Sequence, residues 1–393
     1  MALLTCAVLA VAAPAWAVGP GDPAYIPPGK TLVIVGQQNP AVHEAYTSGV
    51  GIEPAGLMYY AGLEWAPRDF RGNLTWIQQD LDRHSEAALQ LGLTMGYSPV
   101  WSTLGGNPQL PGAVKVAAGV YDQQLRQLAE WLNGLGDRPV FIRVGYEFDL
   151  LGGQWGTPAQ YKAAYRHIVD LLRRRGVDNA AYVWHSAGAF FRTADYSGLA
   201  GLLGTLDRTG GALDPVVNGS TALLRQGARL TGTEPDLLPI RAFYPGPGYV
   251  DYFGISYWDD ACCFGRSSAD ARDIYRQRTR ELLRQARAMG LPLMMAETTP
   301  AYIGADSGAP SLTWIRRYFG LIERFDMRAT AYIDPDWPSI DNGFWGSPYW
   351  GHFWPDARIE ANAGTCHLWL EEIAKSRYVN GPVAPSGPTG PCA

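Results

Sequence analysis

Short apolar stretches alternate with amphipathic stretches along most of this 393-residue chain, and this alternation restricts the fold more than any other feature. The apolar stretches lack a polar face, which is typical of strands buried on both sides in a parallel sheet covered by helices. We predict strands at residues 31–36, 55–60, 94–101, 139–147, 180–185, 250–258, 293–297 and 328–334. Helical segments are predicted between them at residues 40–48, 76–91, 120–135, 158–175, 269–289 and 312–325. Eight strands of this kind favour closure into a single (β/α)8 (TIM) barrel, an α/β fold, over an open sheet.

Both ends of the chain depart from this pattern. The first residues are apolar and end in Ala15-Trp16-Ala17, which resembles a signal-peptide cleavage site, and Pro14 and the short length argue against a membrane anchor. The last residues are rich in glycine and proline, which disfavour a helix or a central strand. We therefore expect a signal peptide at 1–17, a barrel domain at 18–378 and a tail at 379–393. The protein is expected to be secreted, extracellular or periplasmic, without membrane contact after cleavage.

The composition narrows the range of partners. The formal net charge is −5 and the chain has no basic block or stripe, so we expect no nucleic-acid partner. Hydrophobic residues make up 47% and charged residues 18%, which is enough for the large core of one barrel. The aromatic content of 12% also suits stacking against sugar rings. We expect a monomer that acts on a polysaccharide.

Four cysteines would remain after cleavage of the signal peptide: Cys262, Cys263, Cys366 and Cys392. An even number in an exported chain predicts two disulfides. Neighbouring cysteines rarely bridge each other, so Cys262 and Cys263 are expected to pair separately with Cys366 and Cys392, in an order that stays open. A zinc site is the alternative, but the C-x-x-C spacing and nearby histidines are missing. We expect no metal and no cofactor.

Two apolar runs each end in a glutamate, Glu147 in residues 141–149 and Glu297 in residues 292–298. Barrel strands deliver catalytic side chains at their carboxyl ends, where active sites form. Two carboxylates at this rim suit the chemistry of glycoside hydrolysis. The alternative is a pair of surface glutamates in ordinary salt bridges. Turn residues after each glutamate, together with the many aromatic residues, favour catalysis.

Residues near Glu147 are candidates for supporting roles. Arg143 shares a strand face with Glu147 and lies one layer beneath it, where it would hold carboxylates in place and modulate their pKa. It could also be an arginine that is simply satisfied inside the barrel. Asp149 could raise the pKa of Glu147 through like-charge proximity, or it could be a solvated loop residue.

The chain resembles the glycoside hydrolase clan with catalytic glutamates on strands four and seven, and is most similar to family 26, known mainly for β-mannanases. The similarity runs from Val33 to Trp369. The resemblance implies that Glu147 is the acid/base and Glu297 the nucleophile of a retaining enzyme. It rests on these segments: Val35-Gly36-Gln37, Arg143 before Glu147, Tyr161 to Arg166, Val177 to Trp184, Val250 to Gly254 and Ala296-Glu297. The family usually has histidine before the acid and Met-Asn after it, where this chain has Tyr146 and Phe148-Asp149.

Further residues are predicted to bind the sugar. The family has a tyrosine after strand six that donates to the nucleophile, and Tyr257 is favoured over Trp258 for that role. His185 ends the fifth predicted strand, where it is either structural or a sugar contact. Trp337, in the aromatic segment after strand eight, is a candidate stacking surface for the sugar. The other predicted sugar-binding residues are Tyr146, Trp101, Trp345, Trp350 and Trp354.

The sequence therefore predicts a secreted, retaining endo-β-glycanase acting on a β-1,4-mannan or β-glucan. One alternative is a non-catalytic barrel that binds glycans. Another is a hydrolase of xylan or of a microbial exopolysaccharide. The chain contains no G-x-S-x-G, H-E-x-x-H or phosphate-loop motif, which argues against serine, zinc or nucleotide chemistry.

Overall fold

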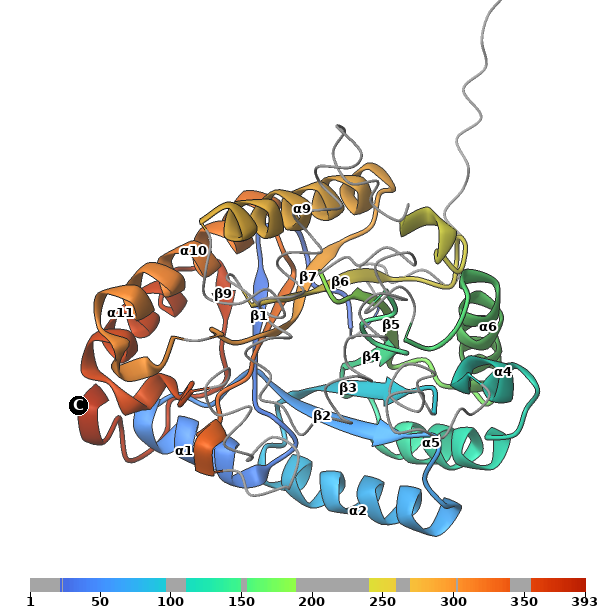
Figure 1. The fold of residues 1–393 in the computed structure, drawn as a ribbon. Coiled ribbons are helices and arrows are strands. Elements are labelled where there is room, and N and C mark those ends of the chain that lie inside the picture. The colour runs from blue at the N-terminus through green and yellow to red at the C-terminus, as the bar shows by residue number, and fades with distance from the viewer. Residues whose placement is uncertain are drawn as a thin grey trace, which may run out of the picture.

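A ring of eight parallel strands forms the centre of the molecule (Figure 1). The computed structural model describes residues 22, 24–96, 111–149, 154–188, 240–258, 269–301, 303–339 and 355–393. The strands of the ring are β1 (Thr31–Val35), β2 (Gly56–Gly62), β3 (Ala88–Thr94), β4 (Val140–Val144), β5 (Ala180–Ser186), β6 (Tyr252–Tyr257), β7 (Leu293–Thr298) and β8 (Ala329–Tyr332). Neighbours in the chain are neighbours in the sheet, and β1 pairs with both β2 and β8. The ring is therefore closed, and the predicted (β/α)8 barrel is confirmed.

Helices surround the ring on its outer side (Figure 1). They are α1 (Pro40–Val50), α2 (Pro67–Arg83), α4 (Gly112–Ala117), α5 (Asp122–Gly134), α6 (Pro158–Arg174), α9 (Ala269–Ala288), α10 (Ala309–Phe325) and α11 (Ala363–Ile373). The start of α6 follows from its sequence. Thr157 accepts a hydrogen bond from the Gln160 backbone, and the Gln160 side chain accepts one from the Thr157 backbone. This reciprocal pair is a capping box, which fixes the start of the helix at Pro158.

The third strand differs from its prediction. We expected a helix at 76–91 and a strand at 94–101, but α2 ends at Arg83 and β3 is already complete at Thr94. The first four residues of β3, Ala-Leu-Gln-Leu, are good helix formers, which favoured the wrong assignment. Its leucines nevertheless alternate with a period of two, and pairing of β3 with β2 and β4 outweighs the local helix preference.

Alternation along the strands divides the core into two layers. One set of side chains packs outward against the helices, for example Leu57, Leu89 and Ile142. The other set fills the barrel interior, for example Ile34, Met58 and Phe141. Because strand side chains alternate between the two sides, position within a strand decides which residues can reach the interior and its rim.

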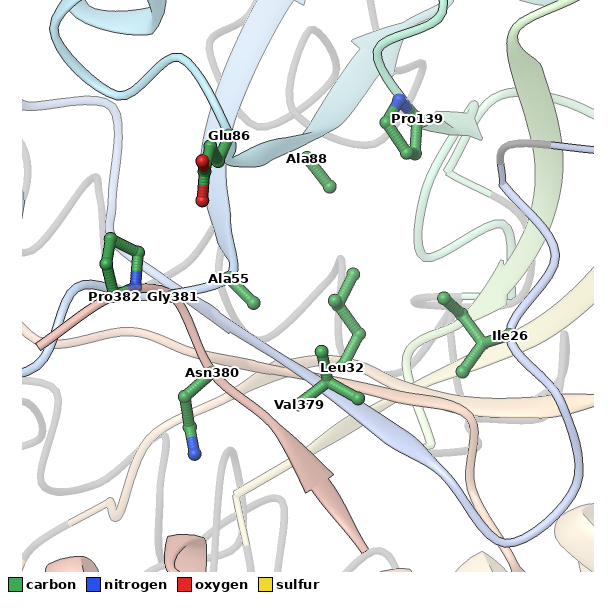
Figure 2. A pocket seen from close by; sticks show the side chains of 10 residues that line it. All are labelled: Ile26, Leu32, Ala55, Glu86, Ala88, Pro139, Val379, Asn380, Gly381 and Pro382. Atoms are coloured by element: carbon green, nitrogen blue, oxygen red, sulfur yellow. The ribbon is translucent and has the colours of Figure 1, made fainter.

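A cavity of about 380 Å³ lies at the amino ends of the strands, opposite to the ends that carry Glu147 and Glu297 (Figure 2). The residues around it come from the starts of β1 to β4 and from the C-terminal segment: Ile26, Leu32, Ala55, Glu86, Ala88, Pro139, Val379, Asn380, Gly381 and Pro382. This end of a barrel usually contributes to stability, and catalytic groups gather at the other end.

The C-terminal segment packs against the barrel beside α1 and α11 (Figure 1). Its strand β9 (Tyr378–Val379) pairs with β1, and a disulfide joins Cys392 to Cys366 of α11. The predicted pairing of Cys366 and Cys392 with Cys262 and Cys263 is therefore wrong. The 3-10 turn η6 (Gly390–Cys392) returns Cys392 to α11, with the two Cα atoms 5.6 Å apart, a distance suited to a disulfide. Cys262 and Cys263 lie outside the described residues.

Candidate active site

Glu147 lies in a turn directly after β4. The strand ends at Val144, and both Gly145 (φ +53°) and Glu147 (φ +52°) have left-handed backbone conformations. A glutamate seldom adopts this conformation, and such residues cluster at functional sites. The backbone N–H of Phe148 donates to the carbonyl of His185 in β5 at 3.1 Å. The neighbouring strand therefore holds the turn in a fixed position.

Asp149 strengthens the same connection between the turn and β5. Its carboxylate accepts hydrogen bonds from the Ser186 hydroxyl at 2.6 Å and from the Ala187 backbone at 2.7 Å. The side chain is buried. Asp149 was predicted to be either a neighbour that modulates Glu147 or a solvated loop residue, and its burial excludes the solvated alternative.

Glu297 reaches the barrel interior because β7 contains an extra residue. Ile255 of β6 pairs with Met295, whereas the next residue, Ser256, pairs with Glu297, so Ala296 has no counterpart. The pairing with β8 shows the same shift. Ala296 already packs in the barrel interior. Simple alternation would turn Glu297 outward, and the bulge redirects it, as bulges next to active sites often do.

Two side chains hold the carboxylate of Glu297. Arg143 of β4 forms an ion pair with one oxygen, and the hydroxyl of Tyr60 from β2 donates to the other at 2.9 Å. Burial and the charge of Glu297 raise the pKa of Tyr60 well above its usual range, so its hydroxyl remains a donor. A guanidinium and a hydroxyl donor thus hold both oxygens of Glu297 in place.

Aromatic rings fix the position of Arg143. Its guanidinium carbon lies 4.8 Å from the centre of the Tyr60 ring and 5.2 Å from that of Tyr146. Gly92 of β3 provides the space, because a Cβ atom there would lie 2.6 Å from the Tyr60 ring and 2.9 Å from Arg143 Nη2. The cation–π contacts and the close packing orient the arginine towards Glu297.

Glu147 contacts a second polar pair. The hydroxyl of Ser256 in β6 donates to Glu147 Oε1 at 2.7 Å, and Nε2 of His185 lies 2.9 Å from the same hydroxyl. Ser256 is also the residue that pairs with Glu297 across β6 and β7. The two glutamates are therefore neighbours of one serine, as a shared site requires.

The two glutamates have different electrostatic surroundings. Burial, followed by the charge of Glu297, raises the pKa of Glu147 to about 8, while the hydrogen bond from Ser256 opposes the rise. The charge of Asp149 raises it further, which is the first of the two alternatives considered for that residue. These surroundings favour the protonated form of Glu147, whereas Glu297 faces a guanidinium. A carboxylic acid beside a carboxylate is the arrangement that acid–nucleophile catalysis needs.

Several predicted sugar-binding residues have other surroundings. The Tyr257 ring stacks on Trp314 of α10 in the outer layer, and the hydroxyl on Glu297 comes from Tyr60. His185 is fully buried and contacts Ser256. The rings of Trp258 and Trp337 pack in the interior cluster. Trp101, Trp345, Trp350 and Trp354 lie outside the described residues.

Tyr146 remains at the site and is partly exposed. Its ring lies 5.5 Å from that of Tyr60, and its carbonyl accepts hydrogen bonds from the side chains of Gln154 and Trp155 at 2.7 and 2.8 Å. This places an aromatic edge beside the two glutamates. Sugar binding by Tyr146 stays a prediction.

Sequence reasoning missed Tyr60, Ser256 and Glu64. Tyr60 and Ser256 occupy inward positions near the carboxyl ends of β2 and β6, which the strand period could have indicated. Glu64 follows β2 and accepts a hydrogen bond from Thr94 at 2.5 Å, adding a carboxylate near the ends of β2 and β3. Within the described ranges, no three His, Cys, Asp or Glu side chains are arranged to hold a metal ion. The helices of those ranges are too short or too polar to cross a membrane.

Comparison with known proteins supports the fold. The chain matches no protein-family model and no curated protein. Among solved structures, it resembles GH26C from Muricauda sp. MAR_2010_75 over 92% of this chain and 91% of that one, with 15% identity and a TM-score of 0.53. It also resembles the exo-β-1,4-mannosidase Op5Man5 from Opitutaceae bacterium strain TAV5 over 88% of this chain and 60% of that one, with 14% identity and a TM-score of 0.53. The expected similarity to glycoside hydrolase barrels, including family 26, is thus confirmed for the fold.

Proposed function

We propose that this protein is a glycoside hydrolase that cleaves a β-linked polysaccharide with retention of configuration. The observation that carries the proposal is the pair Glu147 and Glu297: Ser256 donates to Glu147 and pairs with Glu297 across β6 and β7, and the two glutamates differ in their surroundings. Glu147 has a raised pKa and suits a proton donor, and Glu297 faces Arg143 and suits a nucleophile.

The proposed reaction has two steps. In the first, Glu147 gives its proton to the glycosidic oxygen while the carboxylate of Glu297 attacks the anomeric carbon and the leaving sugar departs. In the second, the Glu147 carboxylate takes a proton from water, which attacks the same carbon and releases Glu297. The Tyr60 and Arg143 contacts orient Glu297 for the attack.

Retention is the outcome we propose for this pair. Ser256 pairs with Glu297 across β6 and β7 and donates to Glu147, so both glutamates belong to one site. Retaining enzymes hold the two carboxyl groups roughly 5–5.5 Å apart and inverting ones ~6.5–9.5 Å apart, and the anomer released first decides between the two mechanisms.

The substrate we favour is a β-1,4-mannan or a β-glucan cut at internal linkages. Its support is the fold shared with GH26C and with an exo-β-1,4-mannosidase, together with the aromatic side chains near the glutamates. Xylan and a microbial exopolysaccharide are the alternatives. A panel of these polysaccharides, with the length of the released products measured over time, distinguishes them and separates internal from terminal cleavage.

The test of catalysis compares the wild type with Glu297→Ala and with Glu130→Gln. Glu130 is an exposed residue of α5, so its variant serves as a matched control. We expect reducing-sugar release by the wild type and the control, and none above background by Glu297→Ala. Substantial turnover by Glu297→Ala would contradict the assignment. Proton NMR of the first product tests retention, since a retaining enzyme releases the β-anomer first.

The second candidate is a barrel that binds glycans without cleaving them. Tyr146 and Asp149 motivate it, because they replace the residues usual beside the acid in the similar family. Binding of a polysaccharide by the wild type, without any product after prolonged incubation, would favour this function.

We also propose that the protein is secreted as a monomer after cleavage near Ala17. The apolar start of the chain and the Cys366–Cys392 disulfide support export. Secretion is tested by the mass of the protein recovered outside expressing cells, which shows whether residues 1–17 have been removed. The monomeric state is tested by light scattering.

A further inference from the structure

We propose that His185 and Ser256 form a hydrogen-bonded relay that positions Glu147 and determines which of its two oxygens carries the catalytic proton. This inference rests on the proposed function, since it assigns positioning residues to the proposed acid. Neither residue contacts the substrate in this scheme, because both are buried beneath Glu147.

The relay crosses three strands. His185 comes from β5, Ser256 from β6 and Glu147 from the turn after β4. Nε2 of His185 lies 2.9 Å from Ser256 Oγ, which lies 2.7 Å from Glu147 Oε1. The backbone bond from Phe148 to the His185 carbonyl ties the turn to the same histidine. One residue therefore supports both the backbone and the side chain of the acid.

The protonation of His185 gives the relay a direction. Burial, and then the charge of Arg143, hold the pKa of His185 well below its usual range, so the ring is neutral and has one N–H. Nδ1 has no hydrogen-bond partner in the described part of the chain. A buried N–H without an acceptor is rare, so the hydrogen belongs on Nε2. Nε2 then donates to Ser256, whose own hydroxyl donates to Glu147.

This direction assigns different tasks to the two oxygens of Glu147. Oε1 accepts from Ser256 and is therefore occupied as an acceptor. The proton of the acid belongs on Oε2, which is the oxygen left to meet the glycosidic bond. Without the serine, the carboxyl could place its proton on either oxygen, and a share of molecules would be misoriented.

The relay also adjusts the acidity of Glu147. The ionisable groups around its carboxyl are Arg143 of β4, Glu297 of β7, Asp149 and Tyr146 of the turn, and His185. Burial and the two other carboxylates favour the protonated form, whereas Arg143 and the Ser256 hydroxyl favour the ionised form. Removing the hydroxyl therefore raises the pKa of Glu147 further.

The first experiment titrates Glu147 directly by NMR of protein labelled with ¹³C in glutamate carboxyls. Its signal is the one missing from Glu147→Gln. In Ser256→Ala we expect the acid dissociation constant to fall by about tenfold, the size of one charge-assisted hydrogen bond. Ser256→Thr, which retains the hydroxyl, should stay close to the wild type. Ser311→Ala removes a buried hydroxyl that bonds to Thr365 in α11, and should change nothing.

His185→Phe tests the other half of the relay. Without its donor, the Ser256 hydroxyl should bond less strongly to Glu147, and the dissociation constant should fall by a smaller factor than in Ser256→Ala. An unchanged titration in Ser256→Ala would overturn the relay. An unchanged titration of Glu147 in His185→Phe would show that His185 does not belong to the relay.

The second experiment measures turnover of aryl glycosides whose leaving groups differ in acidity. Ser256→Ala should lower kcat about tenfold or more for a poor leaving group and much less for a good one, which needs little protonation. An equal loss on both substrates would contradict a positioning role. If the wild type hydrolyses no glycan, the proposed function fails, but the NMR titration still decides whether the relay exists.

Discussion

The ion pair between Arg143 and Glu297 allows a sharp test of how the barrel holds its charges. The side chain of Arg143 is 0% exposed and that of Glu297 12% exposed. Replacing Arg143 with methionine leaves the carboxylate without its guanidinium. Breaking a buried pair on one side costs about 3–5 kcal/mol of unfolding free energy. Glu297→Gln should also be costly, because it leaves a fully buried guanidinium without its charged partner.

The double variant Arg143→Met/Glu297→Gln should be more stable than the sum of the single losses predicts. Neither partner is then charged, so we expect a coupling energy of about 2–3 kcal/mol, measured by urea unfolding. The matched control is the cycle of Arg358→Met and Asp356→Asn. That pair is 2.7 Å apart but 36% and 29% exposed, so its coupling should stay below about 1 kcal/mol.

Similar couplings in the two cycles would refute the view that burial makes the Arg143–Glu297 pair exceptional. Arg143→Lys gives a further check. A lysine keeps the charge but cannot stack its planar fork between the rings of Tyr60 and Tyr146. It should therefore recover only part of the lost stability.

The site and the C-terminal segment give four further predictions. The pKa of Glu147 rises from 4.5 to about 8 on folding, so the wild type loses folding free energy as pH rises between these values. In urea unfolding, Glu147→Gln should therefore become more stable relative to the wild type from pH 5 to pH 8. A difference that stays constant over this range would contradict the raised pKa. In the wild type, kcat/KM on a poor leaving group should decline above about pH 8. Gly92→Ala should cost about 1–3 kcal/mol in the same assay, because its Cβ would meet Tyr60 and Arg143. Gly72→Ala on α2, with open space around it, should instead gain up to about 1 kcal/mol from the higher helix propensity of alanine. Cys366→Ser removes the disulfide and should lower the free energy of unfolding by about 3.5 kcal/mol, the value expected for a loop closed between residues 26 positions apart. A reductant that lowers the melting temperature of the wild type by breaking this disulfide should have less effect on the variant.

The barrel and the two glutamates were accessible from the sequence because each depends on local patterns. Strand and helix periods differ, and an apolar run that ends in a glutamate marks the rim of a barrel. The third strand was misplaced because leucine, alanine and glutamine favour helices, and only pairing with β2 and β4 overrides that preference. The helix propensity of a segment does not show which strands will lie beside it in the sheet.

The partners of the glutamates were harder to predict because they come from distant strands. A tyrosine was expected on Glu297, and Tyr257 was chosen because it follows the sixth strand. In the structure Tyr257 faces the helices and Tyr60, almost 240 positions before Glu297, supplies the hydroxyl. The residue that contacts each glutamate depends on the register of all eight strands around the barrel, which the sequence of one strand does not reveal.

The side chain of Glu297 points inward because of the extra residue in β7, and the presence of a glutamate at this position does not by itself ensure that direction. In a regular strand Ala296 would lie opposite Ser256, and the same glutamate would point towards the helical shell. Deleting Ala296 would instead remove the unpaired residue and leave Glu297 opposite Ser256, on the inner side. Transplanting Ala296 and Glu297 together into a strand without a bulge would therefore deliver the right amino acid to the wrong side, so at this strand the pairing register matters as much as the residue types.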